Sequence, residues 1–188
     1  MKKKAFAALI LGMAAVLAAC GNNNSGASGA KFNDQDVTFA QGMIPHHRQA
    51  VEMATLADTR ATSPQVKELA TAIQGAQDPE IMKMEGWLKD WNKPVAGNGM
   101  SGMDHGSTGG DSMAGMMSDG DMKSLEGASG TEFDMMFLTM MIKHHEGAIT
   151  MAETELADGS NTEAVALAQT IIAAQTGEIA TMKDLLKQ

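Results

Sequence analysis

The chain has 188 residues, with 14 Lys and Arg against 23 Asp and Glu and a formal net charge of −9. This length fits one domain, and the acidic balance argues against nucleic-acid binding, which needs clustered basic side chains to contact phosphates. Aromatic residues make up only 4% and cysteine occurs once, which disfavours an all-β sandwich and rules out an intramolecular disulfide or a multi-thiolate metal site. The 18 methionines are the unusual feature of the composition.

Residues 1–19 have the pattern of a lipoprotein signal peptide. Three lysines, Lys2 to Lys4, precede an apolar stretch that is shorter than a bilayer-spanning helix, and small residues then lead into Cys20. This placement of the only cysteine resembles a bacterial lipoprotein signal, which predicts cleavage before Cys20 and lipidation of its thiol. We therefore expect an exported chain that is anchored to a membrane, with a flexible tether over 20–32 and a folded domain over 33–188.

Four helices are predicted in chain order from apolar residues at helical spacing. Ser63 followed by Pro64 marks the start of the second helix, and Ser160 with Glu163 three residues later forms a predicted capping box for the fourth. The expected ranges are about 34–58, 64–91, 131–158 and 160 to the C-terminus.

The sequence matches itself at a shift of 98 residues, so that His46 and His47 fall on His144 and His145. The duplicated unit is a pair of helices with a short loop, which predicts an antiparallel hairpin. We therefore expect an all-α fold: a four-helix bundle built from two repeated hairpins. A long, flexible, exposed crossover rich in Met and Gly joins them over 92–130, and Ser118 could cap one short helix within it.

Each repeat places two imidazoles among thioethers on the apolar face of its first helix. Buried imidazoles need partners, because an unsatisfied polar group costs about 1–3 kcal/mol. One interpretation is a polar core satisfied by Gln and Glu side chains; the other is metal coordination, with the same side chains orienting the rings. The predicted ligands are Met43, His46, His47, Met53, Met141, His144, His145 and Met151, and the predicted orienting or additional ligands are Gln77, Glu80, Gln175 and Glu178.

The type of ligand indicates the type of metal. Thioether and imidazole groups without a thiolate favour Cu(I) and tolerate Cu(II), whereas harder ions prefer carboxylate oxygens. The crossover supplies further soft ligands on a glycine-rich segment, unless its methionines are neutral filler in a low-complexity linker. These loop candidates are Met100, Met103, His105, Met113, Met116 and Met117.

Residues 39–54, which contain Met43, His46 and His47, closely resemble the first signature of the domain-of-unknown-function-305 family, whose copper-resistance members are the CopM-like proteins. Residues 117–122, 130–134 and 140–148 resemble its second signature, and the likeness covers about 31–188. The resemblance implies an exported, ferritin-like four-helix bundle, with copper binding or copper tolerance in some members. The Glu-x-x-His pairs of the ferritin di-iron pattern are absent, and His-His with Gln-x-x-Glu stand in their place.

The function we predict is that of an exported, lipid-anchored protein without enzymatic activity that sequesters or passes copper. Its expected partners are a metal ion, the membrane through its lipid and an envelope copper-handling protein, and no nucleic acid. One alternative is a di-metal oxidase that uses Glu80, Glu178 and the four histidines. The other is a metal-free structural or interaction bundle of the cell envelope.

Overall fold

The computed structural model describes residues 31–95 and 113–188, and these form five helices without a strand. The signal sequence, Cys20, most of the tether and the candidates Met100, Met103 and His105 lie outside these ranges. None of the described helices is both long enough and apolar enough to cross a membrane. The helices are α1 (Asp34–Arg60), α2 (Pro64–Asp90), α3 (Asp119–Gly127), α4 (Gly130–Asp158) and α5 (Thr162–Leu185).

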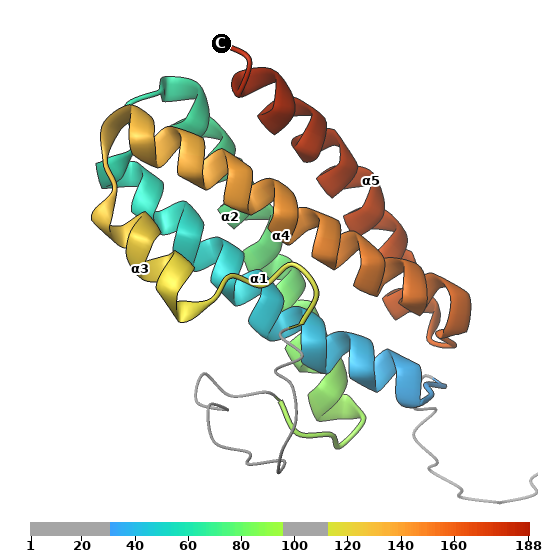
Figure 1. Cartoon of the computed structure of the whole chain (residues 1–188). Coiled ribbons are helices and arrows are strands. Elements are labelled where there is room, and N and C mark those ends of the chain that lie inside the picture. Colours follow the sequence, from blue (N-terminus) through green and yellow to red (C-terminus); the bar gives the residue numbers. More distant parts are fainter. Residues whose placement is uncertain (1–30, 96–112) are drawn as a thin grey trace, which may run out of the picture.

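The four long helices form a helical bundle, as the sequence predicts. α1 packs along α2, α4 packs along α5, and the two pairs meet mainly through α1 and α4 (Figure 1). The short helix expected after Ser118 is present as α3, whose start is closed by a capping box between Ser118 and Asp121. Because α3 packs against α1 and α4, the crossover is not a loop throughout.

The cap predicted for the last helix is wrong by one residue. Asn161, not Ser160, is the N-cap of α5, and its side chain accepts hydrogen bonds from the backbone N–H groups of Glu163 and Ala164. Ser160 instead donates its backbone N–H and its hydroxyl to the carboxylate of Asp36 on α1. Ser160 therefore does not cap α5, because its hydrogen bonds to Asp36 join the second half of the chain to the first.

A layer of buried polar side chains divides the hydrophobic core into two clusters. Along α1, the buried apolar residues from Val37 to Ile44 belong to one cluster, His46 and His47 follow, and the buried apolar residues from Ala50 to Ala61 belong to the other. The same change of cluster occurs at the histidine pair of α4, at Gln77 of α2 and at Gln175 of α5. We call the two parts the Trp87 cluster and the Phe133 cluster, after a residue in each.

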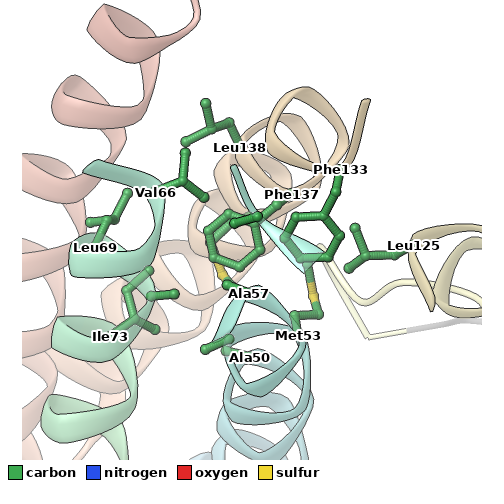
Figure 2. Packing of buried hydrophobic residues seen from close by; sticks show 14 of the residues in the cluster. Ala50, Met53, Ala57, Val66, Leu69, Ile73, Leu125, Phe133, Phe137 and Leu138 are labelled. Carbon is green, nitrogen blue, oxygen red and sulfur yellow. The ribbon is translucent and has the colours of Figure 1, made fainter. Parts of the chain in front are cut away.

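The Phe133 cluster joins all five helices, with Ile179 and Met182 contributed by α5, and Figure 2 shows its central part. Phe133 and Phe137 stack with their ring centroids 5.9 Å apart, and Met53 and Leu125 pack beside Phe133. Met53 lies seven residues beyond His46 on α1, about 10 Å along the helix axis. Its sulfur is therefore part of an aromatic core.

Two aspartates hold the halves together in a reciprocal way. Asp36 of α1 accepts hydrogen bonds from the backbone N–H groups of Ser160 and Asn161, in the turn between α4 and α5. Asp134 of α4, its repeat partner, accepts them from Thr62 and Ser63, in the turn between α1 and α2. Each hairpin turn is thus fixed by the first helix of the other hairpin.

We expect Asp134→Ala to lower the free energy of unfolding by about 2–3 kcal/mol, because two backbone N–H groups lose a charged acceptor. Urea unfolding at neutral pH, followed by circular dichroism, measures this effect. Asp184→Ala is the control: Asp184 is 73% exposed in its pair with Lys187, so its removal should leave stability unchanged within error. Equal stability of the two variants would contradict the role given to Asp134.

Candidate metal centre

All four paired histidines are fully buried, with 0% of each residue exposed. α1 contributes His46 and His47, and α4 contributes His144 and His145. The rings of His46 and His144, which are repeat partners, are in contact in a tilted arrangement, with centroids 3.8 Å apart and an interplanar angle of 43°. The structure therefore brings the two histidine pairs together where α1 meets α4.

Three of the four rings have their Nε2 atom engaged by an oxygen that can only accept a hydrogen bond. His47 Nε2 lies 2.7 Å from Oε2 of Glu80, and His145 Nε2 lies 2.6 Å from Oε2 of Glu178. His46 Nε2 lies 3.1 Å from the backbone carbonyl oxygen of Ala114, in the crossover. Since carboxylate and carbonyl oxygens accept, each of these Nε2 atoms carries a proton, and in the neutral form of imidazole the Nδ1 atom then holds a free lone pair.

Every Nδ1 atom of the four histidines is buried without a hydrogen-bond partner, and so is Nε2 of His144. Unpaired buried polar atoms are rare in folded proteins, and each one costs free energy. An imidazole whose Nε2–H is held by a carboxylate or carbonyl oxygen, with its other nitrogen bare, is the arrangement found around protein-bound metals.

Burial keeps His46 and His144 uncharged. It lowers the pKa of His46 to about 4, with a smaller contribution from His47 and His145, against the opposing hydrogen bond to Ala114. Burial also lowers the pKa of His144 well below its usual value, and the neighbouring histidines add to the effect. Both rings are therefore neutral at physiological pH, which is the form that binds a metal.

The predicted methionine ligands lie on both sides of the imidazole layer. Met43 is in the Trp87 cluster with Met151 packed against that cluster, whereas Met141 and Met53 are in the Phe133 cluster. Met43, Met53 and Met141 are fully buried and Met151 is partly buried. Met53, engaged by aromatic rings, is the least suited of the four to bind a metal.

The crossover methionines differ from one another. Met113 lies over α1 at Gly42. Its sulfur is 3.7 Å from the position that a Cβ on Gly42 would take, and the methyl carbon of Met151 is 2.9 Å from the same position. Met117 is buried in the Phe133 cluster, and its backbone exchanges two hydrogen bonds with the Gln49 side chain. Met117 is therefore a core residue, contrary to the prediction of an exposed loop ligand, while Met116 is half-buried.

The crossover approaches α4 so closely that only glycine fits at the contact. A Cβ on Gly147 would lie 2.0 Å from the carbonyl oxygen of Ala114, and Gly115, at φ +82°, sits over the backbone of His144 and Gly147. This close contact delivers the Ala114 carbonyl to His46. The repeat partner of Gly147 is Gln49, so the corresponding place beside His144 has no such contact.

The predicted orienting residues divide into two kinds. Glu80 and Glu178 reach the surface, with 16% and 21% of their side chains exposed, and each bonds a buried histidine. Gln77 and Gln175 are buried in the same layer, and the amide oxygen of each has no partner. A groove of about 570 Å³ between α2 and α5 makes Glu80 accessible from solvent, and it is lined by Pro79, Glu80, Lys83, Glu163, Ala166, Leu167 and Thr170.

Among the described residues, no three His, Cys, Asp or Glu side chains converge as a ready metal-binding group. The Ala114 carbonyl and the glycines at the crossover contact were not foreseen from the sequence. The one available signal was a glycine at position 147 where the first repeat has Gln49.

The depressed histidine pKa predicts that the metal-free protein loses stability in acid. Below pH 6.5 the unfolded chain takes up a proton on residue 46, whereas the folded chain resists it down to about pH 4. His46 alone then costs about 3 kcal/mol of folding free energy across that window. Urea unfolding in chelator between pH 4 and 7 should show a shallower pH slope for His46→Gln than for the parent, and identical slopes would contradict the buried neutral ring.

The crossover contact predicts opposite effects for two glycine substitutions. Gly147→Ala should destabilise the fold by about 1–3 kcal/mol, because its Cβ would strike the Ala114 backbone, which cannot move without leaving His46. Gly177→Ala, inside α5 with nothing within 4 Å, should stabilise it by up to about 1 kcal/mol. Thermal unfolding of the two variants tests this, and a shift of the same sign in both would overturn the close contact.

A family model described as domain of unknown function DUF305 matches residues 36–186 of the chain. The sequence is also 38% identical over 55 residues to the uncharacterized protein L153 of Acanthamoeba polyphaga mimivirus, a match that covers 29% of this chain and 36% of the viral protein.

Solved structures resemble the whole bundle. A DUF305 protein of Streptomyces coelicolor, described as secreted, is 32% identical with a TM-score of 0.72, over 81% of this chain and 92% of that one. A DUF305 fragment from Deinococcus radiodurans is 31% identical with a TM-score of 0.70, over 82% and 97% of the two chains. CopM in its Cu(II)-bound form is 32% identical with a TM-score of 0.68, over 81% and 95%, and a Cu(I)-bound form of CopM is also known. The chain therefore belongs to the DUF305 family.

Proposed function

We propose that this protein binds copper, with Cu(I) preferred, at the buried layer where its two histidine pairs meet, and that it sequesters the ion or passes it on. The observation that carries this proposal is the set of Nδ1 atoms left without partners while three Nε2 atoms are held by oxygens. Such rings present an oriented lone pair to a metal without first releasing a proton.

The chemistry of the surrounding side chains supports a soft ion. Met43 and Met141 flank the imidazole layer, one in each core cluster, and Met113 and Met151 lie beside Gly42, one helical turn before His46. Thioethers and neutral imidazoles together select Cu(I) over Mg²⁺, Ca²⁺ or Mn²⁺, which prefer oxygen ligands. The copper-bound forms of CopM, at about one third sequence identity, support the same class of ion.

Binding and transfer fit the residues better than oxidation at a di-metal carboxylate centre. Glu80 and Glu178, the carboxylates nearest the layer, each accept a hydrogen bond from a histidine. In that arrangement they orient ligands instead of bridging metals. The layer thus offers histidine nitrogens in fixed positions and no carboxylate bridge between two metals. This arrangement suits an ion that is bound and later released.

We further propose that the protein works outside the cytoplasm, anchored through a lipid on Cys20, and receives or delivers copper by contact with another envelope protein. The signal pattern of residues 1–20 supports the anchor, and the secreted relative from Streptomyces coelicolor supports export. The groove beside Glu80 opens one carboxylate of the layer to solvent and offers a surface on which a partner could dock.

The double variant His46→Ala, His144→Ala should bind Cu(I) at least tenfold more weakly than the parent, a loss of about 1.4 kcal/mol or more, because two nitrogen ligands are removed. Anaerobic titration against a competing Cu(I) chelator measures the dissociation constant. Circular dichroism first establishes that the variant is folded.

Met82→Leu provides the matched control, since Met82 is 64% exposed on α2 and belongs to neither core cluster. Its Cu(I) affinity should equal that of the parent. An unchanged affinity in the folded double-histidine variant would remove the imidazole layer as the site and leave the crossover methionines as the ligands.

A further inference from the structure

Glu155, near the end of α4, is a carboxyl group buried without compensation. None of the residue is exposed, it forms no ion pair among the described residues, and neither of its oxygens has a hydrogen-bond donor in good geometry. An isolated ionised carboxylate is very costly to bury, so such a group takes up a proton instead.

The neighbouring acid is Asp36 on α1: Glu155 Oε1 lies against Gly159, and the next two residues, Ser160 and Asn161, donate their backbone N–H groups to the Asp36 carboxylate. Asp36 is also fully buried, but its oxygens receive four hydrogen bonds: from the backbone N–H groups of Asn33, Ser160 and Asn161, and from the Ser160 hydroxyl. Two adjacent buried carboxyls cannot both ionise, and the one with more donors keeps the charge. Asp36 is therefore the anion of the pair and Glu155 the acid.

The pKa values move apart accordingly. Burial, followed by the hydrogen bond and the charge of Asp36, raises the pKa of Glu155 to about 8. For Asp36, burial alone would raise the pKa, but the hydrogen bonds from Glu155 and from the backbone outweigh it and lower the pKa below its usual value. One proton is thus shared between the two groups at neutral pH.

The comparison of the two repeats indicates that this acid is built into the fold. At the shift of 98 residues, Glu155 and Gly159 correspond to Ala57 and Ala61. A Cβ on Gly159 would lie 2.5 Å from Oε1 of Glu155, so glycine is what makes room for the carboxyl. The first repeat has neither the acid nor the space, although its turn is bound by Asp134 in the same way.

We propose that protonated Glu155 is a pH-sensitive latch: its acid proton, donated to Asp36, joins the end of α4 to the start of α1, and loss of that proton to hydroxide in alkaline solution loosens the α4–α5 turn. Ionised Glu155 would face ionised Asp36 inside the protein, and their repulsion is relieved only by moving apart or admitting water. The latch is closed at neutral pH and opens as the pH rises past about 8.

The charged and polar groups near Glu155 do not compensate for the proton that it loses in alkaline solution. α1 adds the side chain of Gln35, which acts weakly in the opposite direction, and α4 itself adds the exposed Asp158. α5 adds Glu163, which accepts a hydrogen bond from Trp87, and the preceding segment adds Lys31, whose side chain is exposed. The repulsion between the two carboxyls is therefore avoided only while Glu155 keeps its proton.

Amide hydrogen exchange, measured by NMR and corrected for base catalysis, tests the latch at its own hydrogen bonds. Between about pH 7 and 9, protection of the Ser160 and Asn161 amides should fall at least roughly tenfold in the parent. The Thr62 and Ser63 amides, bound to Asp134 in the repeat without an acid, are the internal control and should change less than about twofold.

Two variants complete the experiment. Glu155→Gln keeps a neutral donor toward Asp36 and should abolish the alkaline loss of protection. Glu155→Ala copies the first repeat and should abolish it too, so it provides the same test if the glutamine variant does not fold. The ¹³C signal of the Glu155 carboxyl should titrate near pH 8. A midpoint below about pH 6, or equal loss of protection at both turns, would overturn the proposal.

Discussion

The fold depends on a layer of four buried imidazoles in the middle of a hydrophobic bundle. His46, His47, His144 and His145 separate the Trp87 cluster from the Phe133 cluster, and the buried amides of Gln77 and Gln175 complete the layer. An apolar layer at this level would avoid the unpaired nitrogens that the histidines leave. The arrangement is therefore costly for stability and is explained better by binding than by folding.

The crossover breaks the twofold relation between the repeats at this layer. His46 and His144 are repeat partners and lie against each other, but only His46 receives the Ala114 carbonyl. The glycines at 115 and 147 permit that approach on one side, and Gln49, in place of a glycine, fixes the crossover through Met117 on the other. His144 is left with both ring nitrogens unpaired, which makes it the ring most open to a new ligand.

Much of the fold follows from local and periodic signals in the sequence. The helix ranges, the Ser63 and Ser118 caps and the duplication at a shift of 98 residues are all encoded in short patterns, and the structure agrees with them. The cap at Ser160 was wrong because a distant aspartate, Asp36, competes for that residue. Contacts across the halves leave no local pattern, so they are visible only in three dimensions.

The candidate site was predictable in part for the same reason. Doubled His-His and Gln-x-x-Glu spacing places the rings beside their carboxylates, and the bonds from His47 to Glu80 and from His145 to Glu178 agree with that expectation. Composition could not tell which methionines would lie in the aromatic Phe133 cluster, as Met53 and Met117 do. It also could not reveal a backbone carbonyl as the partner of His46, since every residue carries one.

The exchange of aspartates between the hairpins has a consequence for how such a molecule could arise. Each half carries an aspartate near the start of its first helix and, after that helix, a turn whose backbone N–H groups donate to the aspartate of the other half. Two copies of a single ancestral hairpin would therefore satisfy each other as an isologous dimer, with its axis passing between the facing rings. Once the two copies are joined in one chain they can differ, as Glu155 and Ala57 do at corresponding positions.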